Sequence, residues 1–241
     1  FWLKPFQLLG SDSHCHRQMA MKFYTTPGIP NPDVVHMTAE EIGCTAVLET
    51  VPLNVGKGDN RKPEFLKINP LGEVPALVMP SGQILTESIA IAKYICEKHG
   101  GAVSVYGNTP EERAETDMWI MRTEQKVLEP IGAAFRSGPM FEFFKDRRAG
   151  YVHKEVVEPM RKTGAAGLKW LDGLLADGRQ YLCGDRFCLA DIRFYCLYTF
   201  YSNMDKSQKR DASATPNVIA YLERIKARPS AQAIIPKPSK L

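Results

Sequence analysis

The chain has 241 residues, of which 44% are hydrophobic and 24% are charged, with a formal net charge of +4. This is ordinary globular composition in a chain long enough for one or two domains. Basic residues are interleaved with acidic ones and form no dense runs, which argues against nucleic-acid binding. No apolar run approaches the roughly 20 residues that span a bilayer, so we expect no membrane insertion.

The six cysteines form no C-x-x-C pair, and no histidine lies at metal-ligand spacing from them. Several of them stand inside apolar runs, as small buried side chains do. We therefore expect no disulfide scaffold and no bound metal, and a reducing intracellular compartment.

The two ends of the chain carry separate signals. Residues 1–20 begin at Phe1, show no clean periodicity and are expected to be a flexible extension, possibly not native. The chain finishes with Ser239-Lys240-Leu241, which matches the peroxisomal address read by an import receptor. The alternative interpretation is a chance tripeptide on a polar tail. The expected localisation is peroxisomal or cytoplasmic.

The first half of the chain mixes strand and helix signals. We predict strands at 21–25 and 46–51, and a hairpin of strands at 75–79 and 83–86. A helix is expected from Asp33, as N-terminal cap, to Gly43, as C-terminal cap, and another over 88–99. This order predicts a four-stranded mixed sheet with helices on its faces.

Strand signals disappear after a linker at 102–112, and an all-helical domain is predicted over 113–235, followed by a tail at 236–241. Helical stretches are expected near 111–128, 149–175, 189–201 and 218–226. In the first, Ala114, Met118, Met121 and Leu128 form one apolar stripe at helical spacing. The stretch 189–201 is apolar almost all round, which predicts the buried central helix of a bundle.

Three stretches carry a family resemblance. FLKINPLGEVPAL (65–77), followed by ILTESIAIAKYI (84–95), resembles the glutathione-binding core of the cytosolic glutathione S-transferases. YLCGDRFCLADI (181–192) resembles the folding motif of their helical domain, and ARPSAQA (227–233) resembles their last helix and tail. The resemblance implies an α/β thioredoxin-like glutathione-binding domain over 21–101, an all-α bundle after it, glutathione as co-substrate, and a homodimer.

The resemblance also implies which residues bind glutathione. Val74 precedes a cis Pro75 in the family and pairs through its main chain with the cysteinyl backbone of glutathione. Ser88 would hold the γ-glutamyl carboxylate at a helix start, and Glu87 the ammonium group. Asn60 lies where some classes bind the glycyl carboxylate. Taken alone, the proline could simply begin a strand, and Glu87-Ser88 could simply cap a helix.

Lys57 or Arg61 could bind the glycyl carboxylate in place of Asn60, through charge. Glu73, just before the Val-Pro pair, departs from the neutral or basic residue of many relatives. An acidic group near the glycyl end would weaken glutathione binding slightly unless it points to solvent.

Catalysis requires the glutathione thiolate, which family members stabilise with a hydrogen-bond donor just after the first strand. Laying Pro30-Asn31 over the threonine-proline-asparagine of nu-class and related fungal transferases puts Ile29 where a hydroxyl would stand. Asn31 then becomes the expected catalytic residue, with Thr26 and Thr25 as reserves. The other interpretation of Asn31 is a turn residue between two prolines.

The acceptor pocket is expected between the domains, with Trp119, Met118, Met121, Arg122 and Phe135 as candidates, although core packing explains the apolar ones equally well. Three functions remain open: conjugation of glutathione to a hydrophobic electrophile, glutathione-dependent reduction of disulfides or peroxides, and a non-catalytic binding or interaction protein that keeps the fold. Ile29 and Glu73 favour the third, whereas the Val74-Pro75 and Glu87-Ser88 pairs speak against it.

Overall fold

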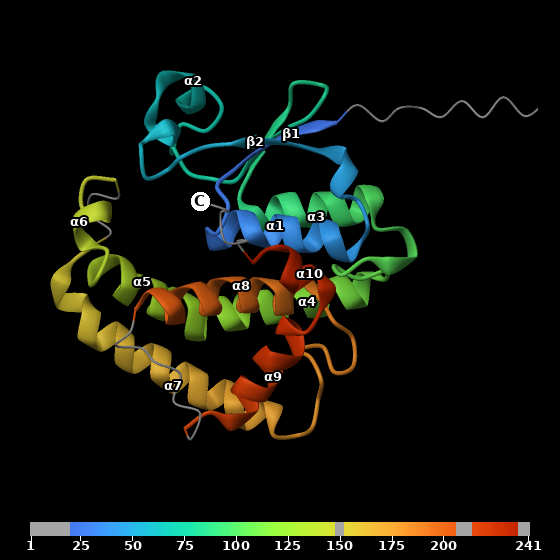
Figure 1. The fold of residues 1–241 in the computed structure, drawn as a ribbon. Helices are drawn as coiled ribbons and strands as arrows, with labels where there is room; N and C mark the ends of the chain where they lie inside the picture. The colour runs from blue at the N-terminus through green and yellow to red at the C-terminus, as the bar shows by residue number, and fades with distance from the viewer. Residues whose placement is uncertain (1–19, 148–151, 206–213, 236–241) are drawn as a thin grey trace, which may run out of the picture.

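The computed structural model describes residues 20–147, 152–205 and 214–235. A four-stranded sheet with its own helices comes first, and a layer of helices follows it (Figure 1). The predicted fold class is therefore confirmed. Residues 1–19 of the predicted extension 1–20, including Cys15, and the terminal tripeptide 239–241 lie outside the described residues.

The sheet has the strand order β2-β1-β3-β4, with bounds β1 Met21–Thr25, β2 Leu48–Pro52, β3 Ala76–Val78 and β4 Ile84–Thr86. β1 pairs parallel with β2 and antiparallel with β3, so that Phe23 stands opposite Thr50 on one side and Leu77 on the other. β2 begins at Leu48 and not at residue 46, because a 3₁₀ turn occupies Thr45–Val47. β3 and β4 are shorter than the predicted 75–79 and 83–86, and the sheet has the predicted four mixed strands.

Helices α1 (Pro30–Glu41) and α3 (Ser88–His99) lie together under one face of the sheet, and the short α2 (Pro63–Leu66) lies beyond the other side (Figure 1). Phe23 and Leu77 from the strands, Val35 from α1, and Ile91 and Ile95 from α3 are fully buried in one cluster. This cluster fixes both helices against the sheet, so that the starts of the two helices become neighbours.

The start of α1 differs from the prediction. The helix begins at Pro30 after Ile29, which caps it without a side-chain hydrogen bond, so Asp33 is not the N-terminal cap. Prolines are tolerated in a first helical turn, because the N–H groups they lack have no intrahelical partner there. Asp33 is already helical, and its amide donates to the Ile29 carbonyl at 3.2 Å. Gly43 follows the end of the helix with φ +67°, as expected of a terminating glycine.

The second half is mainly helical in its described residues, with two isolated β-bridges in the loop before α8. Its elements are α4 Pro110–Thr123, a π-helical turn Glu124–Leu128, α5 Glu129–Ser137, α6 Phe141–Phe144, α7 Val157–Leu175, α8 Leu189–Met204, α9 Pro216–Lys226 and α10 Pro229–Ala233. The first predicted helix therefore continues through the π turn into α5. α6 has no counterpart in the prediction, and α7 begins at Val157, later than the predicted residue 149.

Of the predicted apolar stripe, only Leu128 at the end of the π turn is buried. Met118 and Met121 are 38% and 53% exposed, whereas Trp119 and Ile120 are buried. The buried side also contains two threonines, whose hydroxyls donate to the carbonyl four residues earlier and so need no water. The inner face of α4 therefore combines apolar side chains with threonines whose hydroxyls are satisfied within the helix.

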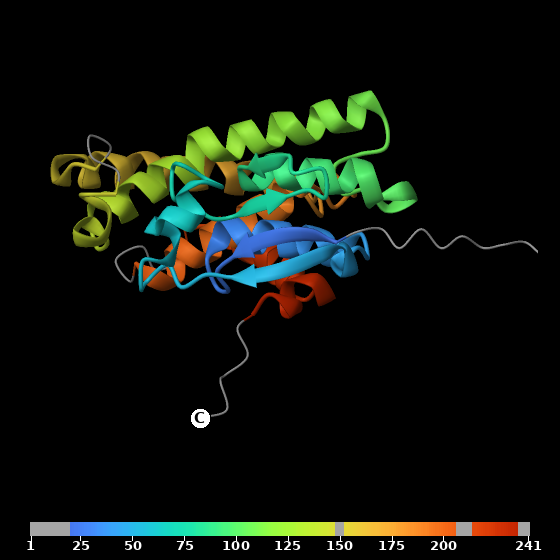
Figure 2. The ribbon, with the colours of Figure 1, turned by 90° about the horizontal axis from the view of Figure 1, so that it is seen from above.

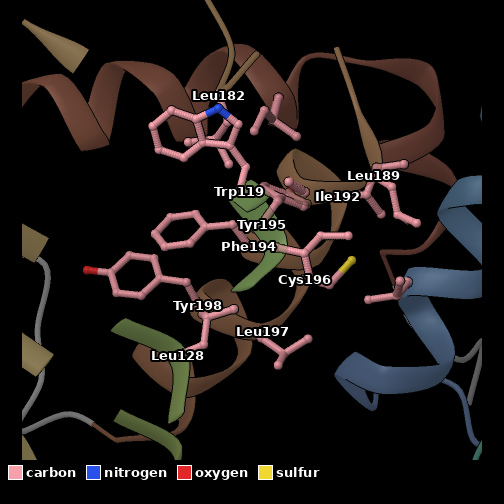
Figure 3. Close-up of a cluster of buried hydrophobic side chains, with 14 of the residues drawn as sticks. Trp119, Leu128, Leu182, Leu189, Ile192, Phe194, Tyr195, Cys196, Leu197 and Tyr198 are labelled. Carbon is pink, nitrogen blue, oxygen red and sulfur yellow. The ribbon is translucent and has the colours of Figure 1, made fainter. Parts of the chain in front are cut away.

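α8 is the central helix, as predicted. Its side chains reach in several directions into the largest buried cluster, with Phe194, Tyr195, Leu197 and Tyr198 packed near Trp119 and Leu182 (Figure 3). The rings of Phe194 and Tyr198 stack at 5.3 Å. Five cysteines among the described residues are free and buried, two of them in α8 or at its cap.

The folding motif at the start of α8 is built as expected. The Asp191 carboxylate is fully buried and accepts from the Cys188 amide at 2.8 Å, the Leu182 amide at 2.9 Å and the Tyr221 hydroxyl at 2.7 Å. Burial raises the pKa of Asp191, although these hydrogen bonds oppose the rise. The cysteine thiol of Cys188 takes the place of a hydroxyl in this capping box.

The two layers are held together along α1. In the view from above, the strands lie over the helices of the second layer (Figure 2). α1 packs against α8 and also against α10. Arg228, just before α10, donates Nε and Nη2 to the two carboxylate oxygens of Glu41, both at 2.7 Å, and Ser230 donates to Glu41 as well. None of the described helices is long and apolar enough to cross a membrane.

Candidate functional site

A cavity of about 220 Å³ lies between the loops of the sheet domain and the helices of the second half. The sheet side contributes Ile29, Pro30, Asn31, Val55, Asn60, Arg61, Gly72, Glu73 and Val74. The helical side contributes Phe135, Arg136, Met140, Phe143, Phe144, Arg147, Phe200 and Tyr201. The sheet side, called the polar wall below, therefore carries two asparagines, an arginine and a glutamate among its residues, and the helical side is mostly aromatic.

The loop before β3 forms part of the polar wall. The Val74–Pro75 peptide bond is cis, as the resemblance implies, and Val74 lines the cavity. The preceding turn is fixed by Asn69, which donates Nδ2 to the Glu73 carbonyl at 2.7 Å and accepts from the Leu71 amide at 3.1 Å. The position of Val74 is therefore set by side chains outside the cavity.

Asn60 and Arg61 hold the opposite edge of this wall. Asn60 is 3% exposed and donates Nδ2 to the Gly72 carbonyl at 2.5 Å, while its Oδ1 has no hydrogen-bond partner. Arg61 donates Nη1 to the Leu71 carbonyl at 3.1 Å. Gly72 has φ +62°, and a Cβ there would lie 2.8 Å from the Asn60 carbonyl, so only glycine fits. Lys57 is exposed and does not line the cavity.

Asn31 reaches the cavity from the first turn of α1. Its Oδ1 accepts from the Ser88 hydroxyl at 3.4 Å and from Arg193 Nη1 at 2.8 Å. Ser88 is the first residue of α3 and is 5% exposed. The exposed Glu87 precedes it with φ +66°, a strained conformation for a residue with a Cβ and one that concentrates at functional sites. The structure thus brings Asn31 and Ser88 together, with Glu87 adjacent, although neither Glu87 nor Ser88 lines the cavity itself.

The two reserve hydroxyls are turned away from the cavity. Thr25 is fully buried, with Oγ1 3.2 Å from the His36 ring nitrogen Nε2. Thr26 donates its hydroxyl to the Leu53 carbonyl at 2.8 Å. Of the three residues considered for the thiolate, only Asn31 lines the cavity.

The aromatic wall comes from α5, α6 and α8. Phe135 contacts Phe200 and Tyr201, with ring centroids 5.7 and 5.4 Å apart. The Arg147 guanidinium lies 3.7 Å over the Phe143 ring. Burial, together with the neighbouring Arg61, lowers the pKa of Arg147. This wall is therefore an apolar surface that also carries the arginines Arg136 and Arg147.

Of the residues expected to line an acceptor pocket, Phe135 alone lines this cavity. Trp119 is buried in the core, and Arg122 lies 5.2 Å over its ring. Met118 and Met121 point out from α4. The helix that contributes Phe135 to this wall is α5, which continues from α4 through the π turn.

Asp33 is an unusual group near the start of α1. Burial raises its pKa to about 7, against the hydrogen bond it receives from the Gly28 amide. Asp33 belongs to a second cavity, of about 450 Å³, between α1, α8 and α9. It titrates near neutrality and must be considered whenever activity is followed against pH.

Arg193 and Glu124 were not predicted as site residues. Arg193 lies on α8 and donates Nη1 to Asn31 and Ser88 and both Nε and Nη2 to Glu124. A single sequence does not show which distant residues come into contact. The one available signal was a charged arginine within a largely apolar helix. Within the described parts of the chain, no group of three or more His, Cys, Asp or Glu could hold a metal ion.

Comparison with known proteins gives consistent matches. The family profile of the glutathione S-transferase N-terminal domain matches residues 19–97, and that of the glutathione S-transferase C-terminal domain matches residues 154–224. Glutathione S-transferase 3 of Zea mays is 30% identical over 222 residues, covering 90% of this chain and 96% of the relative. Glutathione S-transferase 2 of Saccharomyces cerevisiae is 28% identical over 220 residues, covering 89% of each.

Solved structures agree with these matches. The crystal structure of Gtt2 from Saccharomyces cerevisiae superposes with a TM-score of 0.76 at 29% identity, covering 89% of this chain and 100% of that one. Poplar glutathione transferase F1 superposes with a TM-score of 0.75 at 26% identity, covering 90% of this chain and 96% of that one. The similarity therefore extends over both halves of the chain.

Proposed function

Because the chain belongs to the glutathione S-transferase family, we propose that it conjugates glutathione to a hydrophobic electrophile. The observation that carries this proposal is the cavity in which Asn31 and the Val74 loop face an aromatic wall. A peptide thiol with two carboxylates suits the first wall, and an apolar partner suits the second. The asparagine at this position makes the proposed site nu-like.

Glutathione lies along the polar wall in this proposal. The main chain of Val74 pairs with its cysteinyl backbone in the manner of an added strand. The Ser88 amide, at the start of the 12-residue α3, binds the γ-glutamyl carboxylate with the help of the helix dipole, and Glu87 pairs with the ammonium group. The strained conformation of Glu87 supports a role for this residue, since such strain is rarely kept without one.

The glycyl carboxylate lies near Asn60 and Arg61. Of the two alternatives to Asn60, Arg61 lines the cavity and Lys57 does not, which favours Arg61. The Asn60 amide already donates to Gly72, so we assign it to holding the loop as well as to the carboxylate. Glu73 also lines the cavity, so its charge is expected to moderate the attraction of the two arginines Arg61 and Arg147.

The reaction begins with loss of the thiol proton to water. Asn31 Nδ2 donates a hydrogen bond to the resulting thiolate and lowers the thiol pKa. The thiolate attacks the electrophile held against Phe135 and Phe200, a carbon–sulfur bond forms, and either a leaving group departs with the bonding electrons or an activated double bond takes up a proton.

A homodimer completes the proposal. Met118 and Met121 form an exposed apolar stripe with Ala114 along α4, and a stripe of this kind is expected to be covered by a second copy. Sedimentation of a Met121→Lys variant tests it: the variant should sediment as a monomer, and an unchanged dimer would place the interface elsewhere.

Glutathione binding and conjugation test the main proposal together. Isothermal titration with glutathione should show binding by the parent chain, and Glu87→Ala should abolish it. Asn31→Asp keeps the Oδ1 that Ser88 and Arg193 contact but lacks the donor, so it should bind glutathione and lose about 100-fold in conjugation of a general aryl halide. Arg61→Ala should weaken glutathione binding more than the control Lys57→Ala.

The remaining functions are separate outcomes of the same assays. Reduction of a disulfide or a peroxide without conjugation would indicate a glutathione-dependent reductase. Glutathione binding with neither activity would indicate a non-catalytic member of the fold. No glutathione binding would refute the proposal.

A further inference from the structure

Directly behind the cavity, Arg193 connects the two halves of the chain. Its Nη1 donates to Asn31 Oδ1 at 2.8 Å and to Ser88 Oγ at 3.0 Å, and its Nε and Nη2 both donate to Glu124 Oε2 at 3.1 Å. The side chains of Arg193 and Glu124 are 14% and 27% exposed. α1, α3, the π turn and α8 thus meet in one small network.

The chemistry of this network allows Asn31 only one orientation. A guanidinium has five N–H donors and no acceptor, so the atom of Asn31 that faces Arg193 must be the carbonyl oxygen. The Ser88 hydroxyl accepts from Arg193 and donates to the same oxygen at 3.4 Å. Since Oδ1 and Nδ2 lie on opposite sides of the amide group, the donor is turned away from Arg193. Among the described residues, none accepts a hydrogen bond from this donor, and Asn31 lines the cavity.

We propose that Arg193 is a positioning residue that fixes the Asn31 amide with its donor side toward the glutathione thiol. This inference rests on the proposed role of Asn31 in stabilising the thiolate. Without Arg193 the amide can rotate and present its oxygen to the thiolate, which would be repulsive. The cation also polarises the amide that it contacts, and linked hydrogen bonds strengthen one another.

Other charged groups surround this network and enter the test. Glu124 offsets the charge of Arg193, so the Asn31 amide does not lie next to an isolated cation. Asp33, two residues further along α1, has a pKa of about 7. Tyr201 lines the cavity, and burial raises its pKa while Arg136 and Arg193 oppose the rise. Because these groups could also shape the pH dependence of activity, the ionisation of the thiol must be measured directly.

The test measures the pKa of the glutathione thiol bound to the protein, from the ultraviolet absorbance of the thiolate across pH, with S-methylglutathione as the blank. Arg193→Met should raise this pKa by about one unit, a tenfold change in thiolate. Arg193→Lys keeps the charge and can still only donate, so it should restore most of the difference. Arg193→Gln can accept from the amide as well as donate, so it should behave like Arg193→Met.

A double-mutant comparison separates positioning from a direct effect of charge. In an Asn31→Ala background, Arg193→Met should add no further shift, because no amide remains to be oriented. Equal shifts in both backgrounds, or none in either, would overturn the inference. Arg228→Met is the matched control: it removes another arginine that bridges the two halves, through Glu41, without touching Asn31, and should leave the thiol pKa unchanged.

Two further outcomes keep the inference apart from the function on which it rests. If Asn31→Ala raises the thiol pKa and Arg193→Met does not, the proposed function stands and the inference fails. If Asn31→Ala has no effect, the thiolate role of Asn31 fails first. Should Arg193→Met fold poorly because Glu124 is left unpaired, the combination with Glu124→Gln removes that charge and carries the same expectation.

Discussion

Replacement of Asp191 by alanine gives a direct measure of what holds the second domain together. The carboxylate is fully buried and accepts from two amides and one hydroxyl, at Cys188, Leu182 and Tyr221. A buried donor left without a partner costs about 1–3 kcal/mol, so three of them amount to at least roughly 3 kcal/mol. Part of this loss is offset, because alanine does not pay the free-energy cost of burying a carboxylate. We therefore expect a loss of about 4 kcal/mol in the free energy of unfolding, near the range of about 3–5 kcal/mol for breaking a buried charged network.

Urea unfolding at pH 7, followed by circular dichroism and tryptophan fluorescence, measures this loss. Asp172→Ala is the comparison, because Asp172 accepts at 2.9 Å from the Val218 amide at the start of α9 but is only half-buried. It should cost about 1 kcal/mol, as ordinary caps do. If Asp191→Ala costs no more than Asp172→Ala, the carboxylate is not the centre of this network, and our interpretation of the folding motif is wrong.

Three further predictions concern glycine, strain and pH. Gly167→Ala would place a Cβ 1.9 Å from the Lys126 carbonyl oxygen, so its free energy of unfolding should fall by about 2–3 kcal/mol. Gly173 lies on the same helix with nothing within 4 Å of such a Cβ, so Gly173→Ala should raise the free energy of unfolding by about 0.5–1 kcal/mol. Urea unfolding measures both changes. Glu87→Gly relieves the strained φ of +66°, so it should be more stable than Glu87→Ala by about 1 kcal/mol and should melt at a higher temperature, while both variants bind glutathione poorly. Equal melting temperatures would contradict the strain. Because burial raises the pKa of Asp33 from 3.8 to about 7, the folded state binds more protons than the unfolded state between these values, and stability should fall as pH rises from about 4 to 7, by up to roughly 4 kcal/mol. Asp33→Asn should flatten that slope, and a slope that survives would assign it to other groups.

Most of the fold followed from local chemistry. Strand β1 and helix α3 were predicted with their observed bounds. Aromatic and β-branched residues mark the strand, and the glycines after the helix mark its end. Helix α1 begins at Pro30, three residues before the predicted cap Asp33, because a first helical turn tolerates prolines. The inner face of α4 was missed because hydropathy ranks threonine below methionine, although a threonine bonded to its own helix is buried without cost.

The site was predictable on the sheet side and not on the helical side. Asn31 and Asn60 follow β1 and β2, and Val74 precedes the antiparallel β3, so all three lie at the same edge of the sheet and line one cavity. Phe200 and Arg193 stand on α8, and their approach to the cavity depends on how helices pack across the junction. Such contacts join residues as much as 162 positions apart, as between Asn31 and Arg193, and no local pattern records them.

The ion pair between Arg228 and Glu41 affects when each part of the protein can fold during synthesis. The two residues are separated by 187 positions, so the flank of α1 stays uncovered while nearly all of the helical half is synthesised. Domains usually fold one after another as they leave the ribosome. Here the first domain can form its sheet early, but it cannot reach its final surface until α10 has emerged and closed over it. Chaperones that shield apolar surface would therefore be needed longest at α1, and a chain stalled before Arg228 should remain bound to them with its sheet already formed.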